Sequence, residues 1–337
     1  MKKRLLVTDI TLRDGNHAVA HQLSKEQLSA YAAAADAAGA QIVEVGHGNG
    51  IGASSMQVGE AALSDAEMLA AVRAALKQAR MSIHVIPGFA TINKDLRPAV
   101  EAGVDVIRVA SHCTEADITE RHITFAREQG KEVYGVLMMS HMASKEVLLE
   151  EARKMEQYGA EGVVLMDSAG AYLPADVREK IRHLAESLSI PVGFHAHNNL
   201  GLAIGNTLAA AESGAYIVDG AARGFGAGAG NAQLEAMVAV LEKMGYDTGI
   251  DLYRMLDAAD LCERELVKEL PSVKSTSIVS GLSGVFSGFS KPVDRVSKEY
   301  GVDPRDVLFA LGKRGVVAGQ EDIIIEVARE LAEGGKP

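Results

Sequence analysis

The sequence contains no tryptophan, only two cysteines and just 4% aromatic residues in its 337 positions. Two cysteines, Cys113 and Cys262, are too few for a disulfide framework, which favours a reducing cytoplasm. The few aromatic side chains leave little surface for stacking nucleic-acid bases. Basic residues are outnumbered, 34 against 45 acidic ones, and the net charge of -11 argues against a nucleic-acid-binding protein, which needs a basic face.

Long apolar runs are missing as well. Gly, Ser or charged residues interrupt each apolar stretch well before the roughly 20 residues that a membrane span needs, so we expect no membrane segment. The N-terminus, residues 1–9, is basic and then apolar, but it lacks a signal-peptide cleavage region and is typical of a first strand. The hydrophobic share of 47% is ample for a core. Together with the few cysteines and the lack of an apolar span, it leads us to expect a cytoplasmic enzyme.

The first 245 residues alternate short β-rich runs with segments of helical period. Eight such units of about 30 residues each predict an α/β protein with a (β/α)8 TIM barrel. An open doubly wound sheet is the alternative, and the number of units disfavours it. The expected strands are Leu5–Leu12, Gln41–His47, Met81–Gly88, Val104–Ser111, Glu132–Ser140, Glu161–Ser168, Ile190–His197 and Tyr216–Phe225. The expected helices are 24–39, 65–80, 93–102, 115–129, 144–159, 174–188, 199–213 and 231–244.

The pattern divides the chain into a TIM-barrel catalytic domain, residues 1–265, and a mostly helical C-terminal domain, residues 266–337. In the second domain we expect helices near 303–313 and 320–333. We also expect interruptions of the helical pattern at 275–277 and 281–289. No low-complexity linker separates the two, so the C-terminal domain should pack on the barrel, where it can also meet a partner.

Working residues of a barrel lie at the C-terminal ends of its strands, and His195 and His197 lie at the end of the seventh. Residues i and i+2 of a strand point to the same side, so both imidazoles should face the barrel mouth. Asp14, at the end of the first strand, can add a carboxylate. This donor set with open positions suits Mn²⁺, Mg²⁺ or Co²⁺ better than a closed structural zinc site; the alternative is two structural histidines that bond to backbone groups.

Arg13 is adjacent to Asp14, so both can act only if the strand end is bent. Its guanidinium is suited to stabilising an enolate or carboxylate oxygen, or it forms a simple ion pair. His17 is a candidate general base because an imidazole titrates near neutrality, although loop histidines are often idle. His47 is the reserve base. Ser168 offers a hydroxyl to a substrate carboxylate or serves as a cap.

Other mechanisms receive less support. The glycine-rich run 223–231 resembles a phosphate loop, but it has no Gly-Lys-Ser/Thr ending, and close backbone approach explains it better. A Schiff-base aldolase needs a lysine inside the barrel, and no strand end carries one. Cys113 follows the fourth strand and is best interpreted as a small buried thiol rather than a nucleophile.

Three motifs together resemble the metal-dependent pyruvate and acyl-CoA lyase and synthase barrels: residues 8–17 (TDITLRDGNH), 194–199 (FHAHNN) and 226–231 (GAGAGN). Residues 44–48 (EVGHG) and the ending in His17 resemble one branch more closely, the 4-hydroxy-2-oxovalerate aldolase family. The resemblance covers essentially the whole chain.

The resemblance implies retro-aldol cleavage of a 4-hydroxy-2-oxo acid to pyruvate and an aldehyde, as in aromatic hydrocarbon catabolism. It implies Mn²⁺ ligands at Asp14, His195 and His197, an enolate-stabilising Arg13 and a base at His17. Substrate contacts are implied for Arg13, Asp14, Ser168, His195 and Phe286. It also implies an acylating aldehyde dehydrogenase partner that meets the C-terminal helices.

One position departs from the family pattern, which has a tyrosine where this sequence has Phe286. The ring can still form a wall of the substrate pocket, but it lacks the hydroxyl. We therefore expect cleavage to survive and selectivity at the substrate's C4 to relax.

Two rival functions stand beside this one. An enzyme of the same superfamily that condenses an acyl-CoA with a 2-oxo acid would release a thiol, and the short C-terminal segment leaves no obvious regulatory domain for it. A non-catalytic partner subunit would have no use for the set Arg13, Asp14, His17, His195 and His197. The sequence permits an oligomer without fixing one, and it does not specify the aldehyde.

Overall fold

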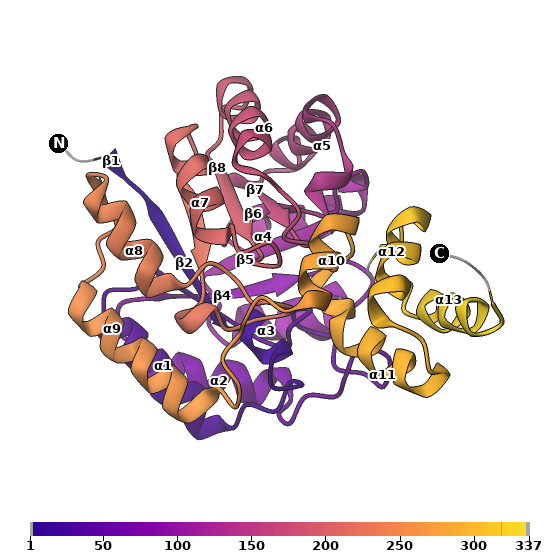
Figure 1. Cartoon of the computed structure of the whole chain (residues 1–337). Helices are drawn as coiled ribbons and strands as arrows, with labels where there is room; N and C mark the ends of the chain where they lie inside the picture. Colours follow the sequence, from indigo (N-terminus) through magenta and orange to yellow (C-terminus); the bar gives the residue numbers. More distant parts are fainter. Residues whose placement is uncertain (1–2, 318, 335–337) are drawn as a thin grey trace.

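A closed barrel of eight parallel strands forms the centre of the molecule, as the computed structural model shows for residues 3–317 and 319–334 (Figure 1). Each strand pairs with the next along the chain, and the last pairs with the first. The predicted TIM barrel is therefore confirmed. The barrel strands are β2 (Leu6–Leu12), β3 (Ile42–Val45), β4 (Arg80–Val85), β5 (Val106–His112), β6 (Glu132–Met138), β7 (Gly162–Asp167), β8 (Val192–Ala196) and β9 (Ile217–Gly220). Two further short strands, β1 (Lys3–Arg4) and β10 (Tyr246–Asp247), pair in parallel outside the barrel.

The strands are buried on both faces, which explains their nearly continuous apolar sequences. One cluster fills the barrel interior, with Val106, Val136 and Val164 among its members. A second, larger cluster lies between the strands and the surrounding helices. A charged side chain inside this barrel therefore needs a buried partner.

Helices surround the barrel and cover its outer face (Figure 1). Capping boxes at Ser24 with Gln27 and at Ser64 with Glu67 begin the first two. The barrel helices are α1 (Lys25–Ala37), α2 (Asp65–Ala75), α3 (Arg97–Glu101), α4 (Glu120–Glu128), α5 (Lys145–Gln157), α6 (Pro174–Ser187), α7 (Ala203–Glu212) and α8 (Leu234–Lys243).

Several of the expected helices are shorter than predicted, and two of them begin with an irregular turn. The expected helix 93–102 consists of a π-helical turn, Ile92–Leu96, followed by α3, which has Pro98 in its first turn. Proline has no N–H to donate, so it is tolerated only near the start of a regular helix. The expected helix 115–129 begins as a 3₁₀ turn, Ala116–Thr119, before α4.

The chain beyond the barrel forms α9 (Leu252–Leu261), α10 (Ser275–Ser283), α11 (Ser290–Tyr300), α12 (Pro304–Arg314) and α13 (Asp322–Ala332). The prediction that the helical pattern is broken at 275–277 was wrong, because these residues begin α10. The backbone N–H of Lys274 donates to Ser277 Oγ at 2.7 Å, so serine caps the helix start. The helix ends at Gly284, which has a φ of 69°.

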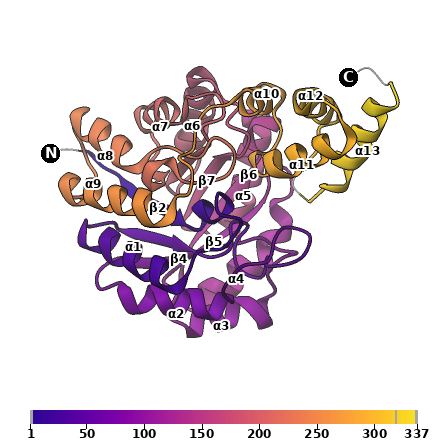
Figure 2. The same cartoon turned by 60° about the horizontal axis from the view of Figure 1, so that its bottom comes forward.

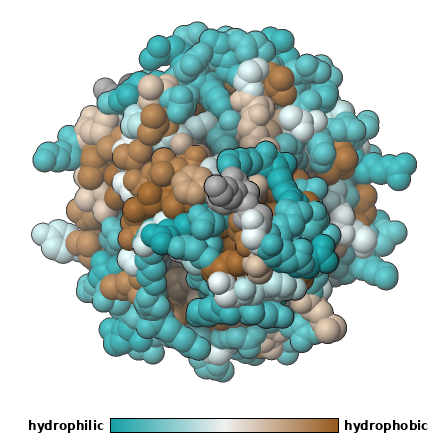
Figure 3. All heavy atoms as spheres, turned by 45° about the vertical axis from the view of Figure 1, so that its right-hand side comes forward, coloured by the Kyte–Doolittle hydropathy of each residue, from teal (hydrophilic) through white to brown (hydrophobic). Residues whose placement is uncertain are grey.

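The helices α10 to α13 lie together at one side of the barrel mouth (Figure 2). They form a hydrophobic cluster of their own around Phe289, Val293 and Leu308. Several large apolar side chains of this region stay exposed, and Figure 3 shows hydrophobic patches between hydrophilic ones on this face of the molecule. The exposed apolar side chains on these helices include Ile278, Leu282, Phe309 and Ile325.

Hydrogen bonds join this segment to the barrel loops. Asn199, which follows β8, donates through Nδ2 to Ser287 Oγ at 2.9 Å and to Ser280 Oγ at 3.3 Å. A ring nitrogen of His141 lies 3.0 Å from the carbonyl oxygen of Gly284. The C-terminal segment is therefore packed on the barrel, as the sequence predicts.

Candidate active site

Asp14, His195 and His197 meet at the C-terminal end of the barrel. Each offers one ligand atom, and these atoms all lie within 4.8 Å of one another in a buried position. The two Nε2 atoms of His195 and His197 are 3.4 Å apart, and His197 Nε2 is 3.9 Å from Asp14 Oδ2. The structure thus brings together the three residues that the sequence selects as metal ligands.

The carboxylate of Asp14 is held in place from three directions. Asn231 Nδ2 and the backbone N–H of Ala227 donate to Oδ1 at 2.9 and 3.2 Å, and Arg13 Nη1 donates to Oδ2 at 2.6 Å. Burial alone would raise the pKa of Asp14, but Arg13 and the nearby imidazoles hold it well below its usual value. Asp14 is therefore ionised, as a metal ligand must be.

The two imidazoles also fit a divalent cation. His195 Nδ1 lies 3.0 Å from Asp219 Oδ2, and this contact directs Nε2 toward the cluster. Burial lowers the pKa of His197 to about 4, although Asp14 opposes the shift, so its ring is neutral near pH 7. Two imidazole nitrogens with a carboxylate oxygen suit Mn²⁺, Mg²⁺ or Co²⁺.

The chain bends directly after β2, as the adjacent Arg13 and Asp14 require. The bend is formed by the 3₁₀ helix η1 (Asp14–His17). Arg13 donates through Nε to Glu44 Oε1 at 2.6 Å, while its Nη2 is buried without an acceptor among the residues that the structure describes. A buried guanidinium N–H without a partner is suited to an oxygen atom of a bound substrate.

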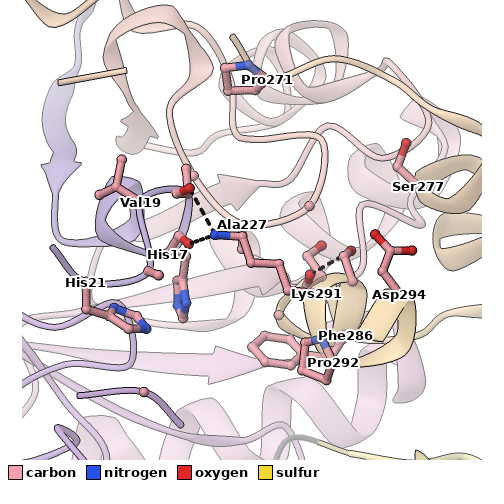
Figure 4. Close-up of a pocket in the computed structure, with 18 of the residues that line it drawn as sticks. His17, Val19, His21, Ala227, Pro271, Ser277, Phe286, Lys291, Pro292 and Asp294 are labelled. Carbon is pink, nitrogen blue, oxygen red and sulfur yellow. Dashed lines mark hydrogen bonds between the residues drawn. The ribbon is translucent and has the colours of Figure 1, made fainter. Parts of the chain in front are cut away.

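His17 lines a cavity of about 710 Å³ between the barrel mouth and the C-terminal segment (Figure 4). Gly48 supports one side of its ring, because a Cβ at that position would lie 2.5 Å from His17 Nε2. Burial lowers the pKa of His17 to about 4, against the attraction of Asp14, so the ring is unprotonated near neutrality, as a general base must be.

His47, the reserve base, lies in a less suitable environment. Its Nε2 is 3.0 Å from the carbonyl oxygen of Gly59, and its Nδ1 accepts from the N–H of Asn49 at 3.1 Å. The ring stacks on His21 with a centroid distance of 3.6 Å. Both ring nitrogens are thus already engaged, which leaves His17 as the better candidate.

The C-terminal segment provides one wall of the cavity. Phe286 lines it and packs edge-on against Phe289, with ring centroids 5.7 Å apart. Lys291, from α11, donates to the carbonyl oxygens of His17 and Ala18 at 2.8 and 2.9 Å (Figure 4). The segment therefore contacts the loop that carries the candidate base.

Ser168 lies at the end of β7, fully buried. Its Oγ accepts from the N–H of Met139 at 2.9 Å, and its carbonyl oxygen accepts from the N–H of Ser287 at 2.9 Å. It does not line the 710 Å³ cavity. A contact between Ser168 and the substrate stays a prediction.

The glycine-rich loop 223–231 approaches Asp14 closely. A Cβ at Gly226 would lie 2.0 Å from Asn231 Nδ2 and 2.5 Å from Asp14 Oδ1, so a larger residue would displace the carboxylate. Close backbone approach thus explains this glycine, as the sequence predicts.

Sequence reasoning missed two residues of the site, Arg108 and Asp219. Both are fully buried, and Arg108 Nη2 donates to Asp219 Oδ2 at 2.5 Å. The available signal was a lone charge inside an apolar strand, since β5 reads Val-Ile-Arg-Val and β9 begins Ile-Val-Asp. Such a charge is costly in a barrel interior unless it is paired.

None of the helices in the described part of the chain is long and apolar enough to cross a membrane.

Comparisons with known families give two matches along the chain. The family described as HMGL-like matches residues 4–262, and the DmpG-like communication domain matches residues 271–333. The chain is 65% identical over 331 residues to a 4-hydroxy-2-oxovalerate aldolase of Spirochaeta aurantia, covering 98% of this chain and 97% of the relative. It is 62% identical over 333 residues to the enzyme of the same name from Pectobacterium atrosepticum, covering 99% and 97%.

Solved structures give the fold alone. The carboxyl transferase domain of Rhizobium etli pyruvate carboxylase, with pyruvate and biocytin, matches with a TM-score of 0.83 at 17% identity. The match covers 99% of this chain and 61% of that chain. The N-terminal domain of a putative aldolase from Bacteroides vulgatus matches with a TM-score of 0.74 at 23% identity, covering 88% of this chain and 98% of that chain.

Proposed function

The chain belongs to the family of 4-hydroxy-2-oxovalerate aldolases, and from this premise we propose that it is a metal-dependent (class II) lyase. Its substrate is a 4-hydroxy-2-oxo acid of the 4-hydroxy-2-oxopentanoate type, and its products are pyruvate and an aldehyde such as acetaldehyde. The observation that carries the proposal is the buried group of Asp14, His195 and His197 at the same barrel end as Arg13 and His17.

Asp14, His195 and His197 hold the metal in this proposal, with Mn²⁺ as the first choice and Mg²⁺ and Co²⁺ as alternatives. When bound, such a cation supplies Lewis-acid polarisation of the substrate's keto group.

The chain's own residues move the proton and hold the developing charge. His17, neutral near pH 7, takes the proton of the C4 hydroxyl group. The C3–C4 bond then breaks, the aldehyde leaves, and the electron pair becomes the enolate of pyruvate. Arg13 donates to the enolate oxygen through Nη2, which has no acceptor among the described residues. A proton from solvent adds to C3 to complete pyruvate, and His17 returns its proton to solvent.

The remaining site residues shape the substrate pocket. Phe286 forms the wall on the C4 side, where the absence of a hydroxyl relaxes the choice between enantiomers. Ser168 contributes to the substrate-carboxylate side, where its position at the end of β7 supports the role.

We divide the chain into a catalytic domain, residues 1–265, and a C-terminal domain, residues 266–337. The match to a communication domain and the exposed apolar side chains of α10, α12 and α13 support a partner there, for which we propose an acylating aldehyde dehydrogenase. We place the enzyme in the cytoplasm and its reaction in aromatic hydrocarbon catabolism.

The test is pyruvate release from racemic 4-hydroxy-2-oxopentanoate by metal-stripped protein, with and without added Mn²⁺. We expect release only with Mn²⁺. Release without metal would contradict the role of Asp14, His195 and His197. No release under either condition, together with thiol release from acetyl-CoA and a 2-oxo acid, would favour the acyl-CoA condensing enzyme instead.

A further inference from the structure

A continuous chain of buried polar contacts crosses the barrel interior from Arg13 to His195. Arg13 Nε donates to Glu44 Oε1 at 2.6 Å, and Arg108 Nη1 donates to Glu44 Oε2 at 3.2 Å. Arg108 Nη2 donates to Asp219 Oδ2 at 2.5 Å, and the same oxygen lies 3.0 Å from His195 Nδ1. The side chain of Arg13 is 3% exposed and the other four are 0% exposed.

Arg108 joins the two halves of this series of contacts. Glu44 lies on β3 and Asp219 on β9, the two strands that flank β2, while Arg108 reaches them from β5 across the interior. One amino group of the guanidinium binds each carboxylate. Because the guanidinium is planar and rigid, it fixes the position of one carboxylate relative to the other.

Each carboxylate in turn holds one functional side chain. Glu44 receives the Nε–H of Arg13 and Asp14 receives an Nη1–H, so Nη2, which has no acceptor in the described part of the chain, is open to an oxygen atom of the substrate. Asp219 contacts Nδ1 of His195, so that Nε2 of this ring stays available for a metal. The guanidiniums of Arg13 and Arg108 face the carboxylates of Asp14, Glu44 and Asp219, and two positive against three negative groups leave one negative charge for a cation to balance.

We propose that Arg108 is a positioning residue that couples the enolate-binding guanidinium of Arg13 to the metal ligand His195. The inference rests on the proposed function, because it assigns Arg13 and His195 the roles given above. One fully buried arginine thus sets both the affinity for the metal and the affinity for the enolate.

A purely structural role makes a different prediction. Arg108 lies between Val106 and Ala110 on the inward face of β5, and both neighbours belong to the apolar cluster of the interior. If Arg108 only filled this space, its replacement would lower the melting temperature and leave the affinities of the folded protein unchanged.

The experiment measures two affinities of Arg108→Lys by titration calorimetry. The first is that of Mn²⁺ for the metal-stripped protein, and the second is that of oxalate, an analogue of the pyruvate enolate, at saturating Mn²⁺. Lysine keeps the charge but cannot bind two carboxylates in a fixed geometry, so we expect both affinities to fall, by ~10-fold or more. The matched control is Arg80→Lys, at the opposite end of the barrel, where Arg80 pairs with the half-buried Glu132, and it should change neither affinity.

Two variants of the carboxylates test separately the contacts that support His195 and the contacts that support Arg13. Asp219→Asn should weaken Mn²⁺ binding by ~10-fold and Glu44→Gln should weaken oxalate binding by ~10-fold, each with a smaller effect on the other ligand. If Arg108→Lys does not fold, the double variant that carries both Asp219→Asn and Glu44→Gln supplies the test. Because Arg108 links the two carboxylates, the effect of the double variant on either affinity should differ by ~3-fold or more from the product of the two single effects.

Folded Arg108→Lys with both affinities unchanged would overturn the proposal, as would additive carboxylate variants. Loss of only one affinity would also overturn the coupling, because Arg108 would then serve one half alone. Failure of the proposed function is separately visible, since the unsubstituted protein would then show neither Mn²⁺ binding nor Mn²⁺-dependent pyruvate release.

Discussion

The two sides of the candidate site are built in different ways. On the barrel side, Arg13, Asp14 and the two histidines are at most 3% exposed and are held by buried charge pairs. On the side of the C-terminal segment, Phe286 is only half-buried, and Lys291 reaches the barrel through hydrogen bonds to backbone oxygens. In the proposed mechanism, bond cleavage therefore depends on the buried barrel side, whereas selectivity at the substrate's C4 depends on the separately packed C-terminal segment.

The comparison predicts that the largest loss of activity follows a substitution on the barrel side. Asp14→Asn removes the negative ligand while keeping the shape of the side chain. We expect Mn²⁺ affinity to fall more than ~100-fold and pyruvate release to fall roughly 10³-fold. Calorimetry and a pyruvate assay measure both. The control is Asp257→Asn, an exposed position on α9, and a variant of Asp14 that still binds Mn²⁺ tightly would contradict the metal site.

A smaller effect is expected where the barrel supports the base. Gly48→Ala places a methyl group within 2.5 Å of the His17 ring, so the ring must move. We expect kcat to fall by ~100-fold, because a shift of about 1 Å in a catalytic group has this cost. Mn²⁺ affinity should stay unchanged. Gly205→Ala, with nothing within 4 Å of the new methyl group, is the control, and full activity of Gly48→Ala would remove His17 as the base.

The contact of Lys291 with the η1 loop tests the other side. Lys291→Met removes the hydrogen bonds to the carbonyl oxygens of His17 and Ala18. Each such bond is worth about 1 kcal/mol, so we expect kcat/KM to fall by roughly 5- to 10-fold, with Lys291→Arg restoring part of it. Lys298→Met, an exposed lysine on the same helix, should have no effect. A loss as large as that of Gly48→Ala would erase the distinction between the two sides.

Phe286→Tyr should alter selectivity with little change in rate. A hydroxyl that bonds the C4 side contributes about 1 kcal/mol, which corresponds to roughly a fivefold preference between enantiomers. The fraction of racemic 4-hydroxy-2-oxopentanoate consumed measures it. Strict single-enantiomer turnover by the unsubstituted protein, or an unchanged preference in the variant, would show that position 286 does not set the choice.

The last prediction concerns stability rather than activity, through the buried His141 that contacts Gly284. Burial lowers the pKa of His141 to about 4, so the folded protein resists a proton that the unfolded chain accepts below about 6.5. The free energy of unfolding therefore falls as the pH drops from about 6.5 to 4 and then levels off. In His141→Gln we expect the fall between pH 7 and pH 5 to be smaller by about 2 kcal/mol.

Urea unfolding of metal-free protein at pH 7 and pH 5 measures this difference. The other histidines contribute equally to both proteins, so the comparison isolates position 141. His183→Gln, on α6, is the control histidine. An identical pH dependence in His141→Gln and the unsubstituted protein would contradict the prediction.

The sequence predicted the barrel well because each of its units is encoded locally. Apolar runs mark the strands, and the capping boxes at Ser24 and Ser64 mark helix starts that depend on residues only three positions away. The helix over 275–283 escaped prediction because serine and glycine are weak helix formers, and this helix is stabilised by packing against α12.

The site was predictable in part for the same reason. The spacing of His195 and His197 along one strand determines that both face one side, and strand order places Asp14 nearby. The support of these residues could not be predicted. Arg108 and Asp219 are 111 residues apart in the chain, and nothing in either local sequence indicates the partner.

The sequence by itself determined the alternating elements, the resemblance to a family and the ligand types at the strand ends, because these depend on hydrophobic period and short spacing. Only the tertiary structure decided how the ligands are held. Closure of the barrel brings Glu44, Arg108 and Asp219 into a fully buried interior, where charges must pair with one another. Packing of the C-terminal segment places Phe286 and Lys291 beside His17.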